Sequence, residues 1–281
     1  THRPCGAEAA DRRVRQLIGV GNMTTTAVNL NHYLERPGDL LSRPRSESDG
    51  FSRRDIESFQ LAAARRKLER HADRIPAVRR LLKNRNPSTF DCFEDFASIL
   101  YDENAYKSYD LAWIENRQFD RLTHWLDGFT THDLSSVTLD DCSSLTDWCG
   151  RINEQADTFV CHSSGTSGVL SFVPRSRRDR DLAVDHVAWY SQPLFLPQQR
   201  NDVTYFCMQA RRQYRITQPI YDGLEQRYRI NPVQALTDFL SPEFFIAQGK
   251  LRKATAMGTV ETCLQNPIVS AYREEVERYQ N

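Results

Sequence analysis

Several features that would assign this 281-residue sequence to a particular class are missing from it. It has no net charge, because 37 basic residues balance 37 acidic ones, whereas a dedicated nucleic-acid-binding protein carries a basic excess. No apolar run approaches the roughly 20 residues that cross a bilayer, so we expect no membrane span. The seven cysteines form no CxxC pair and are odd in number. We therefore expect reduced thiols in a cytoplasmic protein.

Lysine is scarce as well. Only five of the 37 basic residues are lysines, namely Lys67, Lys83, Lys107, Lys250 and Lys253. The remaining composition, 40% hydrophobic and 26% charged, is typical of a globular protein. The charges are unevenly distributed, since residues 51–86 hold eleven basic and four acidic side chains and residues 87–161 hold four and fifteen. This contrast predicts either that the two segments dock on each other or that they form two solvated faces.

Apolar spacing and capping residues predict helices through most of the first 156 residues. Ser52 and Asp55 resemble a capping box at the start of a helix that Pro76 ends or restarts. The other helices of this part are predicted over residues 93–102, 117–129 and 143–155, the last with Ser143 or Ser144 as its cap. From residue 157 onward, β-favouring runs occupy 157–161, 170–174 (stopped by Pro174) and 203–210. Helical patterns occupy 178–192, 231–240, 241–254 and 266–280, and a cap followed by proline starts each of the last three, at Asn231, Ser241 and Asn266.

These patterns predict an α/β protein with a helical lead-in. We expect a loosely structured arm over residues 1–50, a helical lead-in over 51–156 and an α/β part over 157–281. The arm contains the polar, turn-forming stretch RPGDLLSRPRSESDG, which is typical of a linker.

The strongest local signal is the loop HSSGTSG, which runs from His162 to Gly168 between two predicted strands. Gly165 and Gly168 permit positive φ angles and a close approach of the backbone to a ligand. Successive backbone N–H groups in such a turn can surround an anion, and phosphate is the expected ligand. Neither the GK[ST] ending of a Walker A loop nor a GxGxxG pattern is present. On composition alone, a plain turn between strands is the more common explanation.

The order of residues in FVCHSSGTSGVLSFVPRS resembles the phosphate-binding loop of adenylate-forming enzymes, the acyl- and aryl-CoA synthetase (AMP-binding) superfamily. That loop commonly reads [ST]SGT[ST]G, and Ser163 to Gly168 match it. His162 and Ser171 are most similar to the phenylacetate–CoA ligase and acyl-protein synthetase branches. The lysine that often follows the loop in that family is missing here, where residues 169–171 read VLS.

The resemblance implies a ligase that activates a carboxylic or fatty acid with ATP as an acyl-adenylate. A thiol, of CoA or of an acyl-acceptor protein, then takes the acyl group. It implies ATP and Mg²⁺ as cofactors, with CoA as an acceptor, and a fold longer than 281 residues, of which this chain would hold the front part. The residues implied to hold the phosphates are Ser163, Ser164, Gly165, Thr166, Ser167 and Gly168, with His162 lining the acyl or nucleotide pocket. The alternatives are a non-catalytic nucleotide- or phosphate-binding module and a helical interaction protein.

Weaker candidates surround this loop. If the loop binds phosphate, Arg175, Arg177 or Arg178 would add positive charge, although RSRR is more common as a solvated turn. The segment 258–261, GTVE, is faintly similar to a glutamate-bearing segment of the family, and Lys250 does not lie in the setting of the family's catalytic lysine.

Two other groups invite a chemical interpretation. Cys161 lies next to His162, but adjacent residues of a strand point to opposite faces, so Cys161 is better explained as a core residue. A metal site is conceivable at His124 and His132 with the acidic residues Asp127 and Asp133, but no third ligand is evident, and we expect no metal site.

Overall fold

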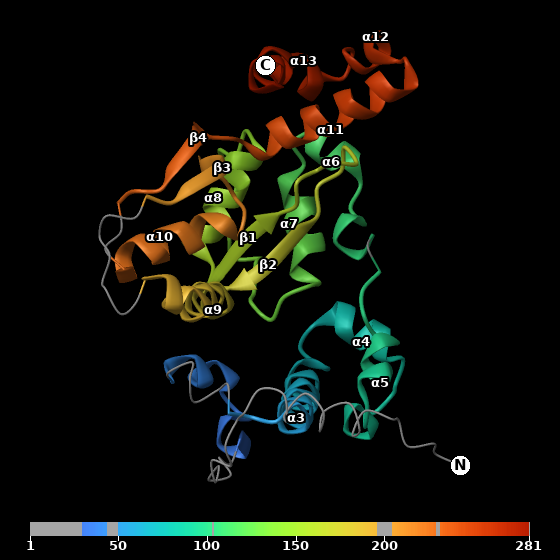
Figure 1. Ribbon diagram of the computed structural model, residues 1–281. Coiled ribbons are helices and arrows are strands. Elements are labelled where there is room, and N and C mark those ends of the chain that lie inside the picture. Colours follow the sequence, from blue (N-terminus) through green and yellow to red (C-terminus); the bar gives the residue numbers. More distant parts are fainter. Residues whose placement is uncertain (1–29, 44–49, 103, 196–203, 229–230, 281) are drawn as a thin grey trace.

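The computed structural model describes residues 30–43, 50–102, 104–195, 204–228 and 231–280 (Figure 1). In this part the chain is mixed α/β and mostly helical, with two small two-stranded sheets. Of the arm expected over 1–50, residues 1–29 and 44–49 lie outside the described residues. The segment between them forms two 3₁₀ helices, η1 (Leu30–Tyr33) and η2 (Pro37–Ser42). This segment packs on a later helix, because the Trp189 Nε1 donates to the Arg43 carbonyl at 3.0 Å.

The basic segment folds into helices as predicted. Helix α3 (Arg53–His71) starts at Ser52, whose hydroxyl accepts a hydrogen bond from the Asp55 N–H at 3.1 Å. Pro76 occupies the first turn of α4 (Pro76–Leu82), where its missing N–H is not needed. After η3 (Pro87–Thr89), helix α5 (Phe93–Ala97) is shorter than the predicted 93–102, because Leu100 is 70% exposed and has no core to face.

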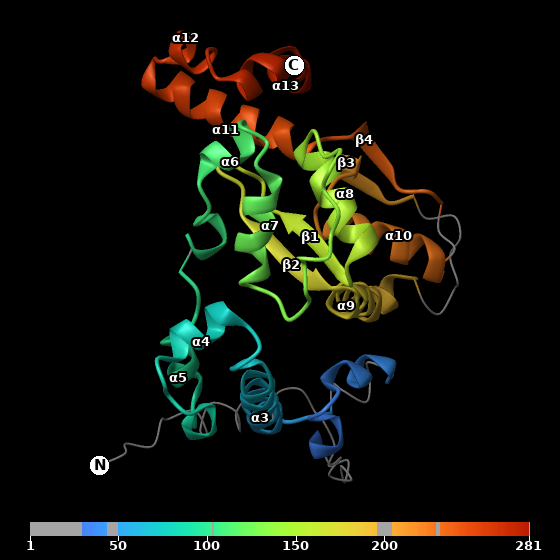
Figure 2. The ribbon, with the colours of Figure 1, turned by 180° about the vertical axis from the view of Figure 1, so that it is seen from behind.

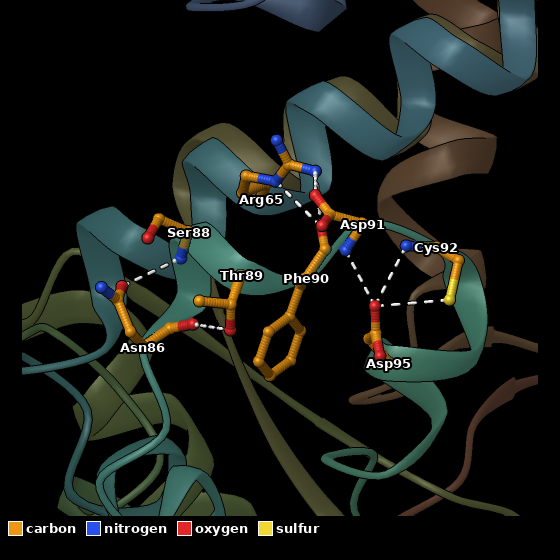
Figure 3. Close-up of polar contacts among 8 residues, drawn as sticks. All are labelled: Arg65, Asn86, Ser88, Thr89, Phe90, Asp91, Cys92 and Asp95. Atoms are coloured by element: carbon orange, nitrogen blue, oxygen red, sulfur yellow. Dashed lines mark hydrogen bonds and ion pairs between the residues drawn. The ribbon is translucent and has the colours of Figure 1, made fainter.

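The basic and acidic segments meet locally. Arg65 on α3 donates to the Phe90 carbonyl at 2.9 Å and pairs with Asp91 at 3.0 Å (Figure 3). Asp95 in turn accepts from the Asp91 N–H at 2.8 Å and from the Cys92 N–H, which starts α5. A small separate core lies beneath these contacts, formed by Ala72, Leu82 and Phe90. Among the described residues, the two segments therefore dock at the first residues of the acidic segment and again at Gly128, whose carbonyl accepts from the Ala77 N–H at 3.0 Å.

The main core combines the second half of the predicted lead-in with the α/β part. The helical elements that contribute are η4 (Ala105–Lys107), α6 (Leu111–Glu115), α7 (Phe119–Asp127) and α8 (Leu145–Gln155). Helices α7 and α8 cover one face of the hairpin β1–β2 (Figure 2). Leu122 of α7, Trp148 of α8 and Val160 of β1 are fully buried in one cluster. The division expected at residue 157 thus separates residues that share a core.

The hairpin consists of β1 (Thr158–His162) and β2 (Phe172–Ser176), paired antiparallel. We expected Pro174 to stop the strand, but it lies inside β2, opposite Val160. The Val160 N–H points away from β2, since it donates to the Asn153 side chain at 2.8 Å. This is therefore a non-hydrogen-bonded pair, where a residue without an N–H costs no ladder bond.

The second sheet corrects another prediction. After α9 (Arg177–Phe195), the chain forms β3 (Phe206–Arg212), α10 (Thr217–Tyr228) and β4 (Gln234–Phe239), with β3 and β4 parallel. The helix predicted over 231–240 is wrong. The ladder of β3 captures this segment, because the Gln234 N–H donates to the Tyr205 carbonyl at 2.9 Å and the Leu240 N–H to the Arg212 carbonyl at 3.3 Å.

The last helices confirm the predicted caps. Ser241 accepts from the Phe244 N–H at 3.1 Å and starts α11 (Pro242–Met257), and Asn266 starts α13 (Pro267–Gln280) after the short α12 (Val260–Cys263). Helix α11 crosses the end of the hairpin where β1 and β2 are connected (Figure 1). Among the described residues, no helix has both the length and the apolar character that a bilayer span requires.

Candidate phosphate-binding loop

The loop connects β1 to β2 and is anchored at its base. The Ser163 N–H donates to the Ser171 carbonyl at 3.0 Å, and the Ser171 N–H donates to the Ser163 hydroxyl at 2.9 Å. From outside the hairpin, the buried Tyr109 hydroxyl donates to the Leu170 carbonyl at 2.9 Å. The Ser163 hydroxyl therefore acts in the closure of the loop, whereas Thr166 and Ser167 are exposed.

The tip of the loop is a tight turn with unused donors. Gly165 and Gly168 have φ angles of 63° and 79°, as expected for glycines in the left-handed region. The Gly168 N–H closes the turn onto the Gly165 carbonyl at 2.7 Å. Within the described residues, the N–H groups of 164–167 have no protein acceptor. Four successive unpaired N–H groups on a fixed turn suit an anion.

Helix α11 supports this turn from one side. A Cβ atom added to Gly249 would overlap the Gly165 carbonyl oxygen and lie 2.6 Å from the Gly168 nitrogen. A Cβ atom added to Gly165 would in turn lie 3.0 Å from the Phe245 carbonyl oxygen. The helix and the loop thus touch backbone to backbone, which fixes the turn. We did not single out Gly249 from the sequence, although an isolated glycine within a helical pattern often marks a close packing contact.

A lysine from a distant part of the chain reaches the loop. The Lys107 ammonium in η4 lies 3.4 Å from the Ser167 hydroxyl oxygen. A second lysine, Lys250 on α11, packs its stem against Gly168, but its ammonium pairs with Glu115 at 2.9 Å. Glu115 also accepts from the Asn266 side chain at 2.7 Å. Because of the hydrogen bond from Lys250, the pKa of the Glu115 carboxyl lies below its usual range.

The arginines proposed for this role from the sequence lie elsewhere. Arg175, Arg177 and Arg178 follow or end β2, and Ser176 pairs with Thr158 at the end of the hairpin opposite the loop. The Arg177 guanidinium is held at that end, since it donates to the Asn153 carbonyl at 2.9 Å and pairs with the Asp157 carboxylate at 3.3 Å. The antiparallel turn-back separates these arginines from the loop they follow in sequence.

His162 is buried beneath the loop, with 4% of its surface exposed. Its Nδ1 lies 2.7 Å from the Ser163 carbonyl oxygen, which can only accept, so Nδ1 carries the proton and Nε2 is an acceptor. Nε2 has no partner among the described residues. Burial lowers the pKa of His162 to about 4, and the charge of Arg215 acts in the same direction. The imidazole ring of His162 is therefore neutral near pH 7. It packs on the ring of Phe245, with the two ring centroids 5.1 Å apart.

The other candidates have structural roles. Burial raises the pKa of Cys161 to about 11, so its thiol stays protonated, as suits a core residue. Gly258 ends α11 with a φ angle of 67° and leads into α12, which accounts for its glycine without a ligand. Asp127 and Asp133 accept hydrogen bonds from nearby backbone N–H groups, and the described residues contain no cluster of three or more potential metal ligands.

Two clefts lie away from the loop. One is lined by Glu69, Arg79 and Asn84, among others, and the second includes Arg36 and Arg178. Neither includes a residue of 162–168. A loop that binds phosphate through exposed N–H groups needs no enclosed cavity, so the hydrogen-bonding geometry is the better guide to the site.

Comparison with known proteins finds no relative, since no family model, curated protein or solved structure matches the chain. The chemistry and geometry of the loop are therefore the guide to what the chain does.

Proposed function

We propose that this chain binds the phosphates of ATP at residues 163–168 and serves an adenylate-forming ligase reaction. The observation that carries the proposal is the set of unpaired N–H groups at 164–167, on a turn held by a hairpin and by α11. Backbone dipoles fixed in this way can stabilise phosphate charge without reorganising, and they do not require a net positive protein.

In the proposed reaction, a carboxylate oxygen attacks the α-phosphorus of ATP. The bond from that phosphorus to the bridging oxygen breaks, and pyrophosphate leaves with the electron pair. The thiol of CoA or of an acceptor protein then attacks the acyl carbon, loses its proton and displaces AMP. The loop would hold the β- and γ-phosphates and orient pyrophosphate for departure, which is a positioning role. Mg²⁺ would share the phosphate charge while keeping mostly phosphate and water ligands.

The proposal extends to substrate and compartment. A small carboxylic acid or a fatty acid is the substrate class that this reaction takes. We place the activity in the cytoplasm, in keeping with the free thiols of the six cysteines in the described part of the chain.

A second candidate is a nucleotide- or phosphate-binding module without turnover. The observation that favours it is the role of 258–261, where Gly258 ends α11 and Glu261 lies in the first turn of α12. That segment connects two helices, so it does not serve as a glutamate-bearing turn beside the loop.

Exchange of labelled pyrophosphate into ATP, measured with a panel of carboxylic acids, tests the first candidate. Calorimetric titration with ATP tests the binding that both candidates share. Thr166→Pro removes one N–H of the turn at a position that proline favours, whereas Thr166→Ala keeps the N–H and removes only the hydroxyl. We expect Thr166→Pro to weaken ATP binding more than Thr166→Ala does. Binding without exchange would favour the module, and absence of ATP binding would leave only the helical interaction protein.

A further inference from the structure

We propose that Lys107 supplies the positive charge of this loop, and that the ligand is a di- or triphosphate whose terminal phosphate lies between the Lys107 ammonium and the loop N–H groups. This inference rests on the proposed function, because it requires the loop to bind phosphate. It adds a residue that precedes the loop by 60 positions and that no local motif marks.

The first argument is that the position of Lys107 is fixed. The Lys107 N–H donates to the Asn104 carbonyl at 2.8 Å within the turn of η4. Two residues later, Tyr109 is 5% exposed and donates to the carbonyl of Leu170, at the end of the loop. The Tyr109 ring also packs on Phe172 at 5.5 Å. These buried contacts hold the backbone beside Lys107 against the hairpin, so the ammonium lies within reach of the loop.

The second argument is that, in the part of the chain that the structure describes, Lys107 has no carboxylate partner. Residues 87–161 contain fifteen acidic and only four basic side chains, yet no carboxylate in the described part of the chain pairs with Lys107. Lys250, the other lysine at the loop, is neutralised by Glu115. In the most acidic region of the sequence, a lysine that faces a loop instead of a carboxylate indicates an anionic ligand.

The third argument concerns the ligand class. Ser167 Oγ lies within reach of the Lys107 ammonium and donates to the Val169 carbonyl at 3.3 Å, so its lone pairs face the lysine. The ammonium and the unpaired N–H groups of Thr166 and Ser167 thus lie around one tip. A terminal phosphate offers several oxygens to such a set at once. The run of free N–H groups from 164 onward leaves donors for the next phosphate.

The experiment is a calorimetric titration of the full chain with inorganic phosphate, pyrophosphate and ATP at several salt concentrations. The variants are Lys107→Met, which keeps the apolar stem, Lys107→Arg, which keeps the charge, and Lys253→Met, a control at an exposed lysine of α11. We expect Lys107→Met to weaken pyrophosphate binding about tenfold or more and to reduce its salt dependence. Lys107→Arg should retain most of the affinity, and the control should match the unmodified chain.

Each outcome has a distinct meaning. Pyrophosphate binding that is unchanged in Lys107→Met would overturn the role of Lys107 while leaving the proposed function intact. Equal affinity for phosphate and pyrophosphate would overturn the assignment of the ligand class. An unmodified chain that binds none of the three would overturn the proposed function itself. Thermal melts of all variants identify any loss of affinity that is caused by unfolding. If Lys107→Met unfolds, the role of Lys107 is judged from whether Lys107→Arg binds pyrophosphate about as tightly as the unmodified chain.

Discussion

Replacement of Gly249 by alanine tests whether α11 sets the shape of the loop. The new Cβ would lie 2.6 Å from the Gly168 nitrogen and 2.8 Å from its Cα, and it would overlap the Gly165 carbonyl oxygen. All three atoms belong to the backbone, so no side chain can rotate away. Real Cβ atoms almost never lie closer than about 3.0 Å to another heavy atom, so the loop and helix must separate by about an ångström or more.

The expected effect on stability is moderate, but the effect on binding is large. Overpacking costs about 1–3 kcal/mol, whereas alanine is favoured over glycine inside a helix by about 1 kcal/mol. We therefore expect a loss of up to about 2 kcal/mol in the free energy of unfolding. Separation moves the N–H groups at the tip of the loop, and each charge-assisted hydrogen bond is worth about 1.5–3 kcal/mol. Loss of one such bond weakens phosphate binding tenfold or more.

The assay combines urea unfolding with calorimetric titration of pyrophosphate. Gly223→Ala is the matched control, because its Cβ would overlap the Val184 side chain between α9 and α10, away from the loop. Gly150→Ala is the mild control, since its Cβ would meet only the Tyr214 hydroxyl at 3.2 Å. If Gly249→Ala bound pyrophosphate as tightly as Gly223→Ala at equal stability, the reasoning that α11 shapes the loop would be refuted.

Three further predictions follow from buried groups. The free energy of unfolding should fall by up to about 3 kcal/mol as the pH drops from 6.5 towards 4. The reason is that the pKa of His162 is about 4 in the folded chain, so over this range the unfolded chain binds a proton at His162 that the folded chain does not. In urea unfolding across this range, His162→Gln should show a weaker dependence of the unfolding free energy on pH. Ser241→Ala should cost about 0.5–2 kcal/mol through loss of the cap on the Phe244 N–H, as chemical denaturation would reveal. Tyr109→Phe should cost about 1–3 kcal/mol by leaving the Leu170 carbonyl unsatisfied, with a control melt of a more exposed tyrosine variant, Tyr205→Phe, expected to change little.

The sequence was a good guide wherever local chemistry decides structure. A serine or asparagine before the first turn predicted the starts of α3, α8, α11 and α13, because the side chain of the cap satisfies an N–H within a few residues of itself. The strand–loop–strand frame around residues 163–168 was also predictable, since two glycines between β-favouring runs leave few alternatives.

Prediction failed where distant residues decide structure. Asn231 and Pro232 offer a cap and a first turn, and Leu236 suggests an apolar helical face. In the structure Leu236 is 56% exposed and the segment is β4, because β3 supplies its backbone partners. Propensity is a weak prior that such pairing overrides.

The same limit explains why the arginines that follow the loop in sequence do not lie beside it in the structure. Reading along the chain favours Arg175 and Arg177, which follow the loop closely, but a hairpin carries the residues after its turn back to the opposite end. The residues that face a hairpin loop must come from elements that cross its tip, here η4 with Lys107 and α11 with Gly249. In the sequence, the scarcity of lysine was the feature that set these residues apart, because two of only five lysines adjoin this loop. One of them, Lys250, is already paired with the Glu115 carboxylate, so Lys107 is the lysine whose removal tests whether a side-chain charge adds to the backbone N–H groups of the loop.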